Sequence, residues 1–371
     1  MRVLYYTQGY GPHDERFLTA LANTSHEVLL LRALPDSNIS LPAGIVEVGL
    51  QDGLSTKPMG IRSQLQRFRR VITAHQPDLV HAGPMHGPAF IAALAGFSPL
   101  VSMSWGYDMQ LDVKKWTSRL AIRHTLHNST IFTGDCRVVA EKAQEFGFPR
   151  ERIHIFPCGV DLAHFSPGAT DVIRQQLGWQ EHFVFLSNRS LEPKYGVDVL
   201  LDAFINAAQI NPDLRLLLYG KGSMENELHQ QVLSAGMQSR VHFGGFASRD
   251  ELPGVYCSAD VFITASHCDG SSVSLMEALA CGRPVIVSDI PANLEWVQER
   301  EQGWVFRDGD STALAQKILD AAAYGELDRL SANTRKLAET KADWSRNFPV
   351  LLEAYLHAIE IHSATSSKGG K

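Results

Sequence analysis

The segment with the clearest capacity for chemistry runs from Asp269 to Glu277 and reads Asp-Gly-Ser-Ser-Val-Ser-Leu-Met-Glu. It follows a predicted strand at 261–264 and opens a predicted helix. The first turn of a helix has unpaired backbone N–H groups and the positive end of the helix dipole, which together attract anions. The residues at 270–273 are mostly small, so a phosphate could approach the backbone there. We interpret the segment as a phosphate cradle with a carboxylate on each side.

Two carboxylates that flank a phosphate cradle suit a ligand with hydroxyl groups at both ends. Asp269 could accept hydrogen bonds at one end, and Glu277, one to two helical turns further on, at the other. A nucleotide sugar has this layout, because its diphosphate lies between a ribose and a sugar. A capped core helix with two solvated acids fits the same pattern equally well, so this alternative stays open.

A second cluster lies at 188–196 and reads Asn-Arg-Ser-Leu-Glu-Pro-Lys-Tyr-Gly, again between a predicted strand and a predicted helix. Arg189 offers a planar fork of donors and Lys194 a point charge, a combination that can neutralise a diphosphate. If a phosphate leaves during a reaction, the same pair would stabilise the charge that develops on it. A surface loop with two solvated cations is the alternative. The expected position of both loops at neighbouring sheet edges favours a binding site.

Apolar runs alternate with amphipathic helical stretches along the chain, which predicts parallel, doubly wound α/β sheets. Strands are predicted in two series, at 3–6, 28–31, 78–81, 100–104 and 130–133, and then at 183–187, 214–219, 240–243, 261–264 and 284–288. The fold class is therefore α/β, with two Rossmann-like domains facing each other across a cleft. Ligands of such sheets bind at the carboxyl ends of the strands, where both loops are expected.

The length of 371 residues is enough for two or three domains. We predict a first domain over 1–165 and a second over 166–343. Helical periodicity then predicts a helix over 344–363. The polar residues at 364–371 are expected to form a disordered tail.

Composition and charge exclude several classes of protein. Hydrophobic residues make up 44% and charged residues 20%, as in ordinary globular chains. The net charge of −6 and the pI of about 6.2 give no overall field that would attract nucleic acid. Five cysteines without a Cys-x-x-Cys pair indicate reduced thiols, and no bilayer span or signal peptide is recognisable, so we expect a cytoplasmic protein.

Several motifs together resemble the retaining glycosyltransferases of family 4, which have the GT-B fold. The segment 269–284 resembles that family's E-x7-E motif and the Gly-x-Pro that follows, and Arg189 and Lys194 fall at the spacing of the family's Arg and Lys. Three further segments resemble its strand-plus-GxG turn, its base-contacting segment and its Asn-Gly-Val-Asp hinge, at 216–222, 241–246 and 158–161. The resemblance covers nearly the whole chain and is strongest over 153–310.

This resemblance implies an acceptor-side first domain, a donor-side second domain and a C-terminal helix that crosses back to the first. It implies catalytic roles for Asp269, Glu277, Arg189 and Lys194, with Glu277 on the donor ribose and Asp269 on the sugar hydroxyls. The expected donor-binding residues are Gly11, Gly220, Gly222, Phe246, Gly270, Ser271, Ser272, Val273 and Glu277.

The activity implied is transfer of a sugar, with retention, from a nucleotide-diphosphate sugar to a hydroxyl group. A UDP-sugar is favoured and a GDP-sugar is the other candidate, while the acceptor would be a glycan, a lipid-linked or a small molecule. In the front-face mechanism of the family, the leaving phosphate takes the acceptor's proton. No metal and no cofactor are expected, and the Asp-x-Asp at 308–310 is interpreted as a turn and helix cap.

The chain departs from the family pattern at several positions, two of which bear on the candidate site residues. Asp269 replaces the first Glu of the E-x7-E motif, which shortens the side chain by one methylene and could change donor choice. The family's His-Gly-x-Asp reads Trp-Gly-Tyr-Asp at 105–108, which leaves Asp108 as a candidate contact to the sugar or acceptor. His86, in a neighbouring Gly/Pro-containing loop, is a second acceptor candidate.

Two other functions and one interaction remain open at this stage. A catalytically silent nucleotide-sugar binding subunit, or a nucleotide-sugar epimerase of the same fold, would share most of these residues. The first 165 residues carry 16 basic and 14 acidic side chains, a net of +2, against 18 and 26 in the rest. Two basic clusters could associate weakly with the inner face of a membrane, hold a charged acceptor or be solvated helix faces: Arg62, Arg67, Arg69 and Arg70, and then Lys114, Lys115, Arg119 and Arg123.

Overall fold

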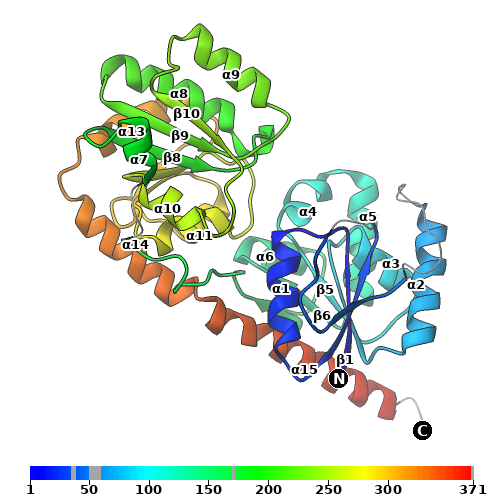
Figure 1. Cartoon of the computed structure of the whole chain (residues 1–371). Helices are drawn as coiled ribbons and strands as arrows, with labels where there is room; N and C mark the ends of the chain where they lie inside the picture. The colour runs from blue at the N-terminus through cyan, green and yellow to red at the C-terminus, as the bar shows by residue number, and fades with distance from the viewer. Residues whose placement is uncertain (35–38, 50–59, 169–171, 369–371) are drawn as a thin grey trace. The chain divides into compact units, whose positions relative to one another are not determined.

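The computed structural model describes residues 1–34, 39–49, 60–168 and 172–368, and it divides into two compact units (Figure 1). The first unit consists of Met1–Pro157 together with Arg346–Lys371, and the second of Cys158–Ser345. The first unit thus ends at Pro157, somewhat before the predicted boundary at 165. The C-terminal residues belong to the first unit, as the resemblance implied.

The first unit is built on a seven-stranded parallel sheet in the order β3-β2-β1-β4-β5-β6-β7. Its strands are β1 (Arg2–Thr7), β2 (Glu27–Arg32), β3 (Ile45–Glu47), β4 (Leu79–Ala82), β5 (Leu100–Met103), β6 (Ile131–Gly134) and β7 (Ile153–Ile155). The five predicted strands of this domain are confirmed within one or two residues. The two edge strands, β3 and β7, were not predicted, because three residues are too few to show a period.

Helices cover both faces of this sheet. They are α1 (Pro12–Ala22), α2 (Ile61–His75), α3 (Pro88–Leu94), α4 (Tyr107–Gln110), α5 (Trp116–Asn128) and α6 (Arg137–Glu145). Helix α3 packs against both α2 and α5, so these three helices form one layer (Figure 1). Phe17 of α1 and Tyr355 near the C-terminus both contact the His81 ring of β4, which places them on a common face of the sheet.

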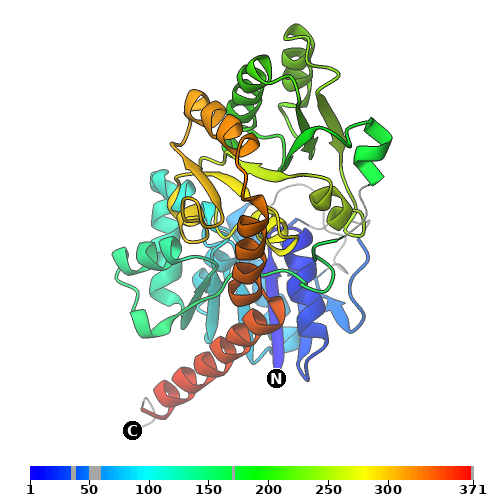
Figure 2. The same cartoon turned by 90° about the vertical axis from the view of Figure 1, so that its left-hand side faces the viewer.

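The long C-terminal helix, α15 (Trp344–Lys368), docks on the first unit through histidines (Figure 2). Tyr355 Oη lies 2.7 Å from His81 Nδ1, and His357 Nδ1 lies 3.0 Å from His154 Nε2. Among the described residues, neither α15 nor any other helix combines the length and the apolar character needed to cross a membrane.

The prediction that the chain loses order from residue 364 is wrong for the described part of that segment. Helix α15 continues to Lys368, while residues 369–371 lie outside the described residues. The Ser363 hydroxyl donates to the Ile359 carbonyl at 2.9 Å, and the Thr365 hydroxyl donates to the Ile361 carbonyl at the same distance. These side chains satisfy helix carbonyls one turn back, so a polar composition is compatible with continued helix.

The second unit has a six-stranded parallel sheet in the order β10-β9-β8-β11-β12-β13. Its strands are β8 (Phe183–Asn188), β9 (Leu214–Tyr219), β10 (Val241–Gly245), β11 (Val261–Thr264), β12 (Val285–Ser288) and β13 (Gly303–Phe306). Its helices include α7 (Val172–Leu177), α8 (Val197–Ile210), α9 (Glu225–Ser234), α10 (Leu252–Cys257), α11 (Val273–Ala280), α12 (Pro291–Leu294), α13 (Ser311–Ala322) and α14 (Leu327–Lys341). The predicted strands are again confirmed, and β13 is the one that was missed.

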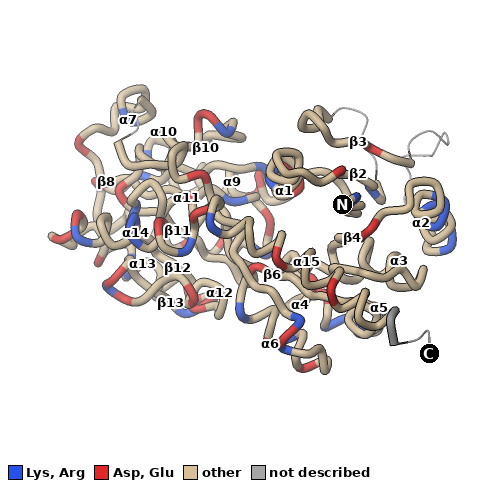
Figure 3. Tube along the Cα trace, turned by 90° about the horizontal axis from the view of Figure 1, so that it is seen from below, with Lys and Arg blue, Asp and Glu red and all other residues tan. Residues whose placement is uncertain are grey.

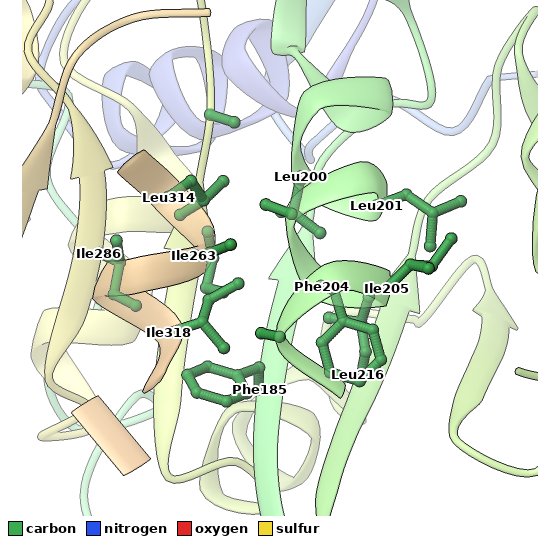
Figure 4. Close-up of a cluster of buried hydrophobic side chains, with 14 of the residues drawn as sticks. Phe185, Leu200, Leu201, Phe204, Ile205, Leu216, Ile263, Ile286, Leu314 and Ile318 are labelled. Atoms are coloured by element: carbon green, nitrogen blue, oxygen red, sulfur yellow. The ribbon is translucent and has the colours of Figure 1, made fainter. Parts of the chain in front are cut away.

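The core of the second unit explains why its strands read as continuous apolar runs. Phe185 of β8 and Ile263 of β11 are buried beneath α8 and α13, with Leu200, Phe204 and Ile318 packed over them (Figure 4). A parallel sheet covered on both faces needs apolar side chains on both sides of each strand. The dense packing also holds the carboxyl ends of β8 and β11, where the loops begin, in one defined position.

The segment at 158–161, which resembles the family's hinge, lies against residues 342–344, where the chain enters α15. Val160 N–H donates to the Ala342 carbonyl at 2.6 Å, and Trp344 N–H donates to the Val160 carbonyl at 3.1 Å. A Cβ on Gly159, which has a φ of 66°, would lie 2.9 Å from Ala342 O and from the Trp344 backbone. The two segments that join the units, around residue 160 and around residue 343, are therefore hydrogen-bonded to each other, and only glycine fits at position 159.

Buried histidines make the first unit sensitive to acid. Burial lowers the pKa of His81 to about 3, with a further contribution from His13. An unfolded chain binds a proton at each histidine below pH 6.5, whereas the folded protein leaves His81 neutral until far lower pH. Between pH 6.5 and about 3, His81 therefore lowers the free energy of unfolding by up to about 1.4 kcal/mol for each pH unit.

We predict that His81→Gln, which keeps a hydrogen-bonding group for Tyr355, reduces the loss of melting temperature between about pH 6.5 and 4. The exposed His127→Gln serves as a control and is expected to melt like the unmodified chain at each pH. Thermal melts monitored by circular dichroism across this range provide the measurement. An unchanged pH dependence of the melting temperature in His81→Gln would show that His81 is not the cause of the acid sensitivity.

Candidate active site

The two loops that carry Arg189 and Lys194 on one side and Asp269 on the other lie side by side at the carboxyl edge of the second sheet. Strands β8 and β11 are neighbours, and the loops that follow them carry residues 189–196 and 265–272. His267 N–H donates to the Lys194 carbonyl at 3.0 Å. The expected closeness of the two loops is therefore observed, and it follows from the strand order rather than from sequence distance.

Arg189 is the centre of the hydrogen bonds that join these loops. Its Nη1 donates to the Ser272 hydroxyl at 2.6 Å and to the Ser274 hydroxyl at 2.8 Å, and its Nη2 forms an ion pair with Asp269 Oδ2. Only 8% of the Arg189 side chain and 17% of the Asp269 side chain are exposed. The guanidinium group thus ties the β8 loop to the start of α11.

Two cations lie against one aromatic ring at this edge. The Arg189 guanidinium lies 4.1 Å from the centre of the Tyr195 ring, and the Lys194 ammonium lies 4.7 Å from the centre of the same ring. Within the described part of the chain, the buried Nε of Arg189 has no hydrogen-bond partner. A buried donor without a partner is costly, and an anionic oxygen would satisfy it.

The start of α11 supplies further donors. Ser272 caps the helix, with its hydroxyl accepting from Leu275 N–H at 3.4 Å, and Asp269 Oδ1 accepts from Gly270 N–H at 3.0 Å. Gly270, Ser271 and Ser272 are buried, whereas Val273 is half-buried. The predicted cradle is therefore a helix N-terminus with small residues packed beside Arg189.

Glu277 sits one turn into α11 and is held by a tyrosine. Tyr256 Oη donates to Glu277 Oε2 at 2.8 Å and accepts from Asn188 Nδ2 at 3.1 Å. Burial, and then the neighbouring Glu277 carboxylate, raise the pKa of Tyr256 well above its usual value. The phenol thus keeps its proton, and the Glu277 carboxylate is held in one orientation with only 6% of the residue exposed.

Gly220 and Gly222 pack against the loop that carries Arg189. A Cβ on Gly220 would lie 2.0 Å from Arg189 O, and a Cβ on Gly222 would lie 2.2 Å from Leu191 O. The structure therefore gives both glycines a positioning role for this loop. Phe246, after β10, is 76% exposed, which leaves its ring available for stacking.

The first-unit candidates have different surroundings. Gly11 precedes α1, and its N–H donates to Asp14 Oδ2 at 3.0 Å. His86 Nε2 lies 3.7 Å from Asp112 Oδ2, and the imidazole is half-buried. Neither arrangement by itself identifies a ligand.

Asp108 is turned inward. Its carboxylate accepts hydrogen bonds from Met85 N–H at 2.8 Å and from the Ser104 hydroxyl at 2.6 Å, and also from the backbone of Trp105 and Met109. The residue has no exposed surface, and burial raises the pKa of its carboxyl group. These contacts favour a role in holding its loop, so we do not retain Asp108 as a contact to the sugar or acceptor.

The Asp-x-Asp segment at 308–310 forms a turn and a helix cap, as the sequence predicted. Asp310 caps α13 by accepting from Ala313 N–H at 2.8 Å, and Asp308 pairs with His267 Nδ1 at 2.6 Å. Within the described ranges, no group of three or more His, Cys, Asp or Glu side chains is arranged to hold a metal ion.

Sequence reasoning missed the supporting residues of the site. Tyr256 lies in a short helix with apolar neighbours, and nothing in the sequence indicates that its hydroxyl reaches Glu277. Ser274 lies within the cradle segment, where its distance of two residues from the cap could have suggested a shared partner. Tyr195 lies directly beside Lys194, but its contact with two cations depends on the packing of the loop.

Comparison with known proteins shows the family to which the chain belongs. Residues 12–164 match the family model described as Glycosyltransferase Family 4, and residues 169–337 match that of Glycosyl transferases group 1. The chain belongs to the group 1 glycosyltransferases, and its two Rossmann-like units are those of the GT-B fold.

Particular relatives show the extent of the similarity. The chain is 31% identical over 156 residues to mannosylfructose-phosphate synthase of Agrobacterium fabrum, covering 39% of this chain and 34% of that protein. It is 28% identical over 252 residues to D-inositol 3-phosphate glycosyltransferase of Nocardia farcinica, covering 63% and 55%. The chain thus matches about a third to a half of the length of these curated relatives.

Two crystal structures show the same fold over almost the whole chain. HepE of Anabaena in complex with UDP-glucose superimposes with a TM-score of 0.77 at 20% identity, covering 98% of this chain and 100% of that chain. Sucrose-phosphate synthase of Thermosynechococcus elongatus gives a TM-score of 0.78 at 17% identity, with the same coverage.

We predict that Gly196→Ala destabilises the second unit by about 2–4 kcal/mol. Gly196 has a φ of 59°, and an added Cβ would lie 2.1 Å from Ala265 O, which belongs to the neighbouring loop. Gly236→Ala is the matched control, since its φ is 68° but no described atom lies within 4 Å of the added Cβ. The control should cost about 1–2 kcal/mol from backbone strain alone. Urea unfolding compares the two, and equal losses would show that the loop contact is unimportant.

Proposed function

We propose that this protein is a retaining glycosyltransferase that moves a sugar from a nucleotide-diphosphate sugar to a hydroxyl group of its acceptor. The observation that carries the proposal is the buried Arg189, which is paired with Asp269, bonded to the start of α11 and left with an unpartnered Nε. Family membership supports the reaction class. The geometry supports a diphosphate as the group that is bound.

The donor would lie along the carboxyl edge of the second sheet. Arg189 Nε and the Lys194 ammonium would neutralise the diphosphate, assisted by the N-terminal end of α11. Glu277, oriented by Tyr256, would accept hydrogen bonds from the ribose hydroxyls. Asp269 would accept from the sugar hydroxyls, and the exposed Phe246 ring would lie against the base.

The chemical step requires little from the protein beyond charge and orientation. The acceptor oxygen forms a bond to the sugar's anomeric carbon as the bond from that carbon to the phosphate oxygen breaks. The leaving phosphate takes the acceptor's proton, so no protein nucleophile is needed and the configuration is retained. Arg189 and Lys194 stabilise the negative charge that grows on the phosphate.

Donor and acceptor preferences follow from the relatives rather than from the site. The similar Anabaena structure holds UDP-glucose, which favours a UDP-sugar here. A relative from Mycolicibacterium smegmatis is named as GDP-mannose-dependent, so a GDP-sugar is the second candidate. Named relatives include enzymes that act on inositol phosphate and on phosphatidylinositol mannoside, consistent with a small-molecule, glycan or lipid-linked acceptor.

The proposed reaction uses neither a metal nor a cofactor. Arg189, Lys194 and the N-terminal end of α11 would stabilise the diphosphate through hydrogen bonds and positive charge supplied by the protein itself. Addition of a chelator should therefore leave turnover unchanged, whereas a large loss would assign part of this role to a metal ion.

We predict that Lys194→Ala and Arg189→Lys each lower kcat by about 100- to 1000-fold. Arg189→Lys keeps the charge opposite Asp269 but loses the fork, so it tests geometry without leaving a buried carboxylate unpaired. Lys336→Ala, an exposed change on α14, is the control and should keep full activity. Full turnover in both site variants would defeat the assignment.

The donor and the type of activity are measured in two steps. A thermal-shift screen with UDP, GDP, ADP and their sugars identifies the ligand, since binding to the native state raises the melting temperature.

Glu277→Gln should reduce that shift by weakening binding about 10- to 100-fold. Release of free sugar from the donor, with the anomer identified by NMR, then separates a retaining transferase from a silent binding subunit. Conversion of the donor to its epimer would instead identify an epimerase.

A further inference from the structure

The outer side of α5 forms a cationic and apolar surface that the proposed function does not use. Six residues, spaced by three or four positions and therefore on one side of the helix, make up this α5 face: Lys115, Trp116, Arg119, Leu120, Arg123 and His127. All six are exposed. The α5 face belongs entirely to the first unit, so its chemistry can be considered without reference to the donor site.

Two large apolar side chains stand exposed on this face. Trp116 is 74% exposed, and Leu120, one turn further along, is 55% exposed. A helix surface gains nothing from such residues in water, and exposed tryptophan beside a cation is typical of the boundary between water and lipid. Their side-by-side placement means that one flat surface could cover both.

The charge of the α5 face is of one sign. None of the thirteen residues of α5 is acidic, and Lys114 and Lys115 precede the helix. Arg119 is held in place by the Phe146 ring, whose centre lies 4.9 Å from its guanidinium carbon. Asp112, which precedes the helix, pairs with Lys115 at 3.2 Å and also lies 3.7 Å from His86.

The neighbouring helix α2 extends this charge. It also has no acidic residue, and Arg62, Arg69 and Arg70 are exposed along it (Figure 3). Because α3 packs between α2 and α5, the three helices present their outer sides together. Arg67, which the sequence grouped with these cations, is instead buried and donates to the Arg32 carbonyl at 2.7 Å.

A cavity of about 720 Å³ opens beside α5. It lies between that helix and the segment after α6, and its walls include Leu120, Arg123, His127, Phe146, Phe148 and Arg152. No acidic side chain is among the described residues that line it. Two guanidinium groups with aromatic and aliphatic walls suit a phosphodiester that carries an acyl glycerol.

We propose that the α5 face binds the surface of an anionic phospholipid bilayer, with a lipid phosphate in the cavity between Arg123 and Arg152. Trp116 and Leu120 would enter the interfacial region, while the arginines of α2 add long-range attraction. A protein partner is a poorer fit, because a stable interface buries about 800 Å² on each side and two apolar side chains supply little of its core. The inference does not depend on the proposed reaction.

Vesicle co-sedimentation of the full chain tests this proposal. The protein should sediment with vesicles of phosphatidylcholine and phosphatidylglycerol but not with phosphatidylcholine alone, and added salt should release it because salt screens the attraction. Each cation near an anionic bilayer contributes enough for about a fivefold change in affinity. Arg119→Gln with Arg123→Gln should therefore weaken binding about 25-fold, and Arg152→Gln about fivefold.

Matched controls separate this surface from general charge. Lys336→Gln removes one exposed cation from the second unit and should leave vesicle binding unchanged. Brominated lipids should quench part of the tryptophan fluorescence of the unmodified chain, and Trp116→Phe should remove that quenching. Circular dichroism melts establish that each variant is folded before its binding is compared.

Three outcomes would overturn the proposal. Absence of binding to anionic vesicles at low salt would exclude the α5 face as a membrane-binding surface. Equal vesicle binding by the α5 variants and the unmodified chain would place the membrane contact elsewhere on the protein. Release of bound protein by glycerol 3-phosphate at concentrations too low to screen charge would make the cavity a site for a soluble phosphate ester. A dimer in sedimentation velocity that the double arginine variant abolishes would identify a second copy of the chain as the occupant.

Discussion

A buried guanidinium group must be neutralised and hydrogen-bonded, and much of the second unit's site follows from meeting that requirement at Arg189. Asp269 supplies the opposing charge, while Ser272 and Ser274 accept two of the remaining N–H groups. These partners come from the β11–α11 loop and α11, whereas Arg189 follows β8. Satisfying one side chain therefore holds the two loops together, and His267 N–H of the second loop also donates to the Lys194 carbonyl of the first. The unpartnered Nε leaves the cluster ready to accept an anion.

The scaffold beneath the cluster is what makes this pairing possible. In a parallel sheet, neighbouring strands end at the same edge, so β8 and β11 deliver their loops to one place. Gly196 and Gly220 then allow backbone approaches that any side chain would block. The Tyr256 hydroxyl orients Glu277 by donating a hydrogen bond to its carboxylate. The polar site is thus rigid because its supporting contacts are made by backbone and buried side chains.

The first unit uses its polar residues in a different way. His81 and Asp108 are buried and hydrogen-bond within the fold, His81 to Tyr355 and Asp108 to residues 85 and 104–109. Several of its cations instead lie on the outer sides of α2 and α5, and the exposed Trp116 lies beside those of α5. The division is physical, since a buried charge needs partners from its own fold while an exposed one can attract a surface of opposite charge.

The amino-acid sequence by itself determined the α/β class, most of the strands in both units, the loops that carry Asp269, Glu277, Arg189 and Lys194, and the resemblance to the family, but not the order of the strands in either sheet. These are local properties, because apolar runs, turn residues and motif spacing are read within a few positions. It ended α15 too early. Only the tertiary structure decided that Arg189 pairs with Asp269, that Tyr256 holds Glu277 and that Asp108 faces inward. Each of these depends on a contact or a burial that arises when segments distant in sequence pack together, and no local pattern records which partner a side chain will meet.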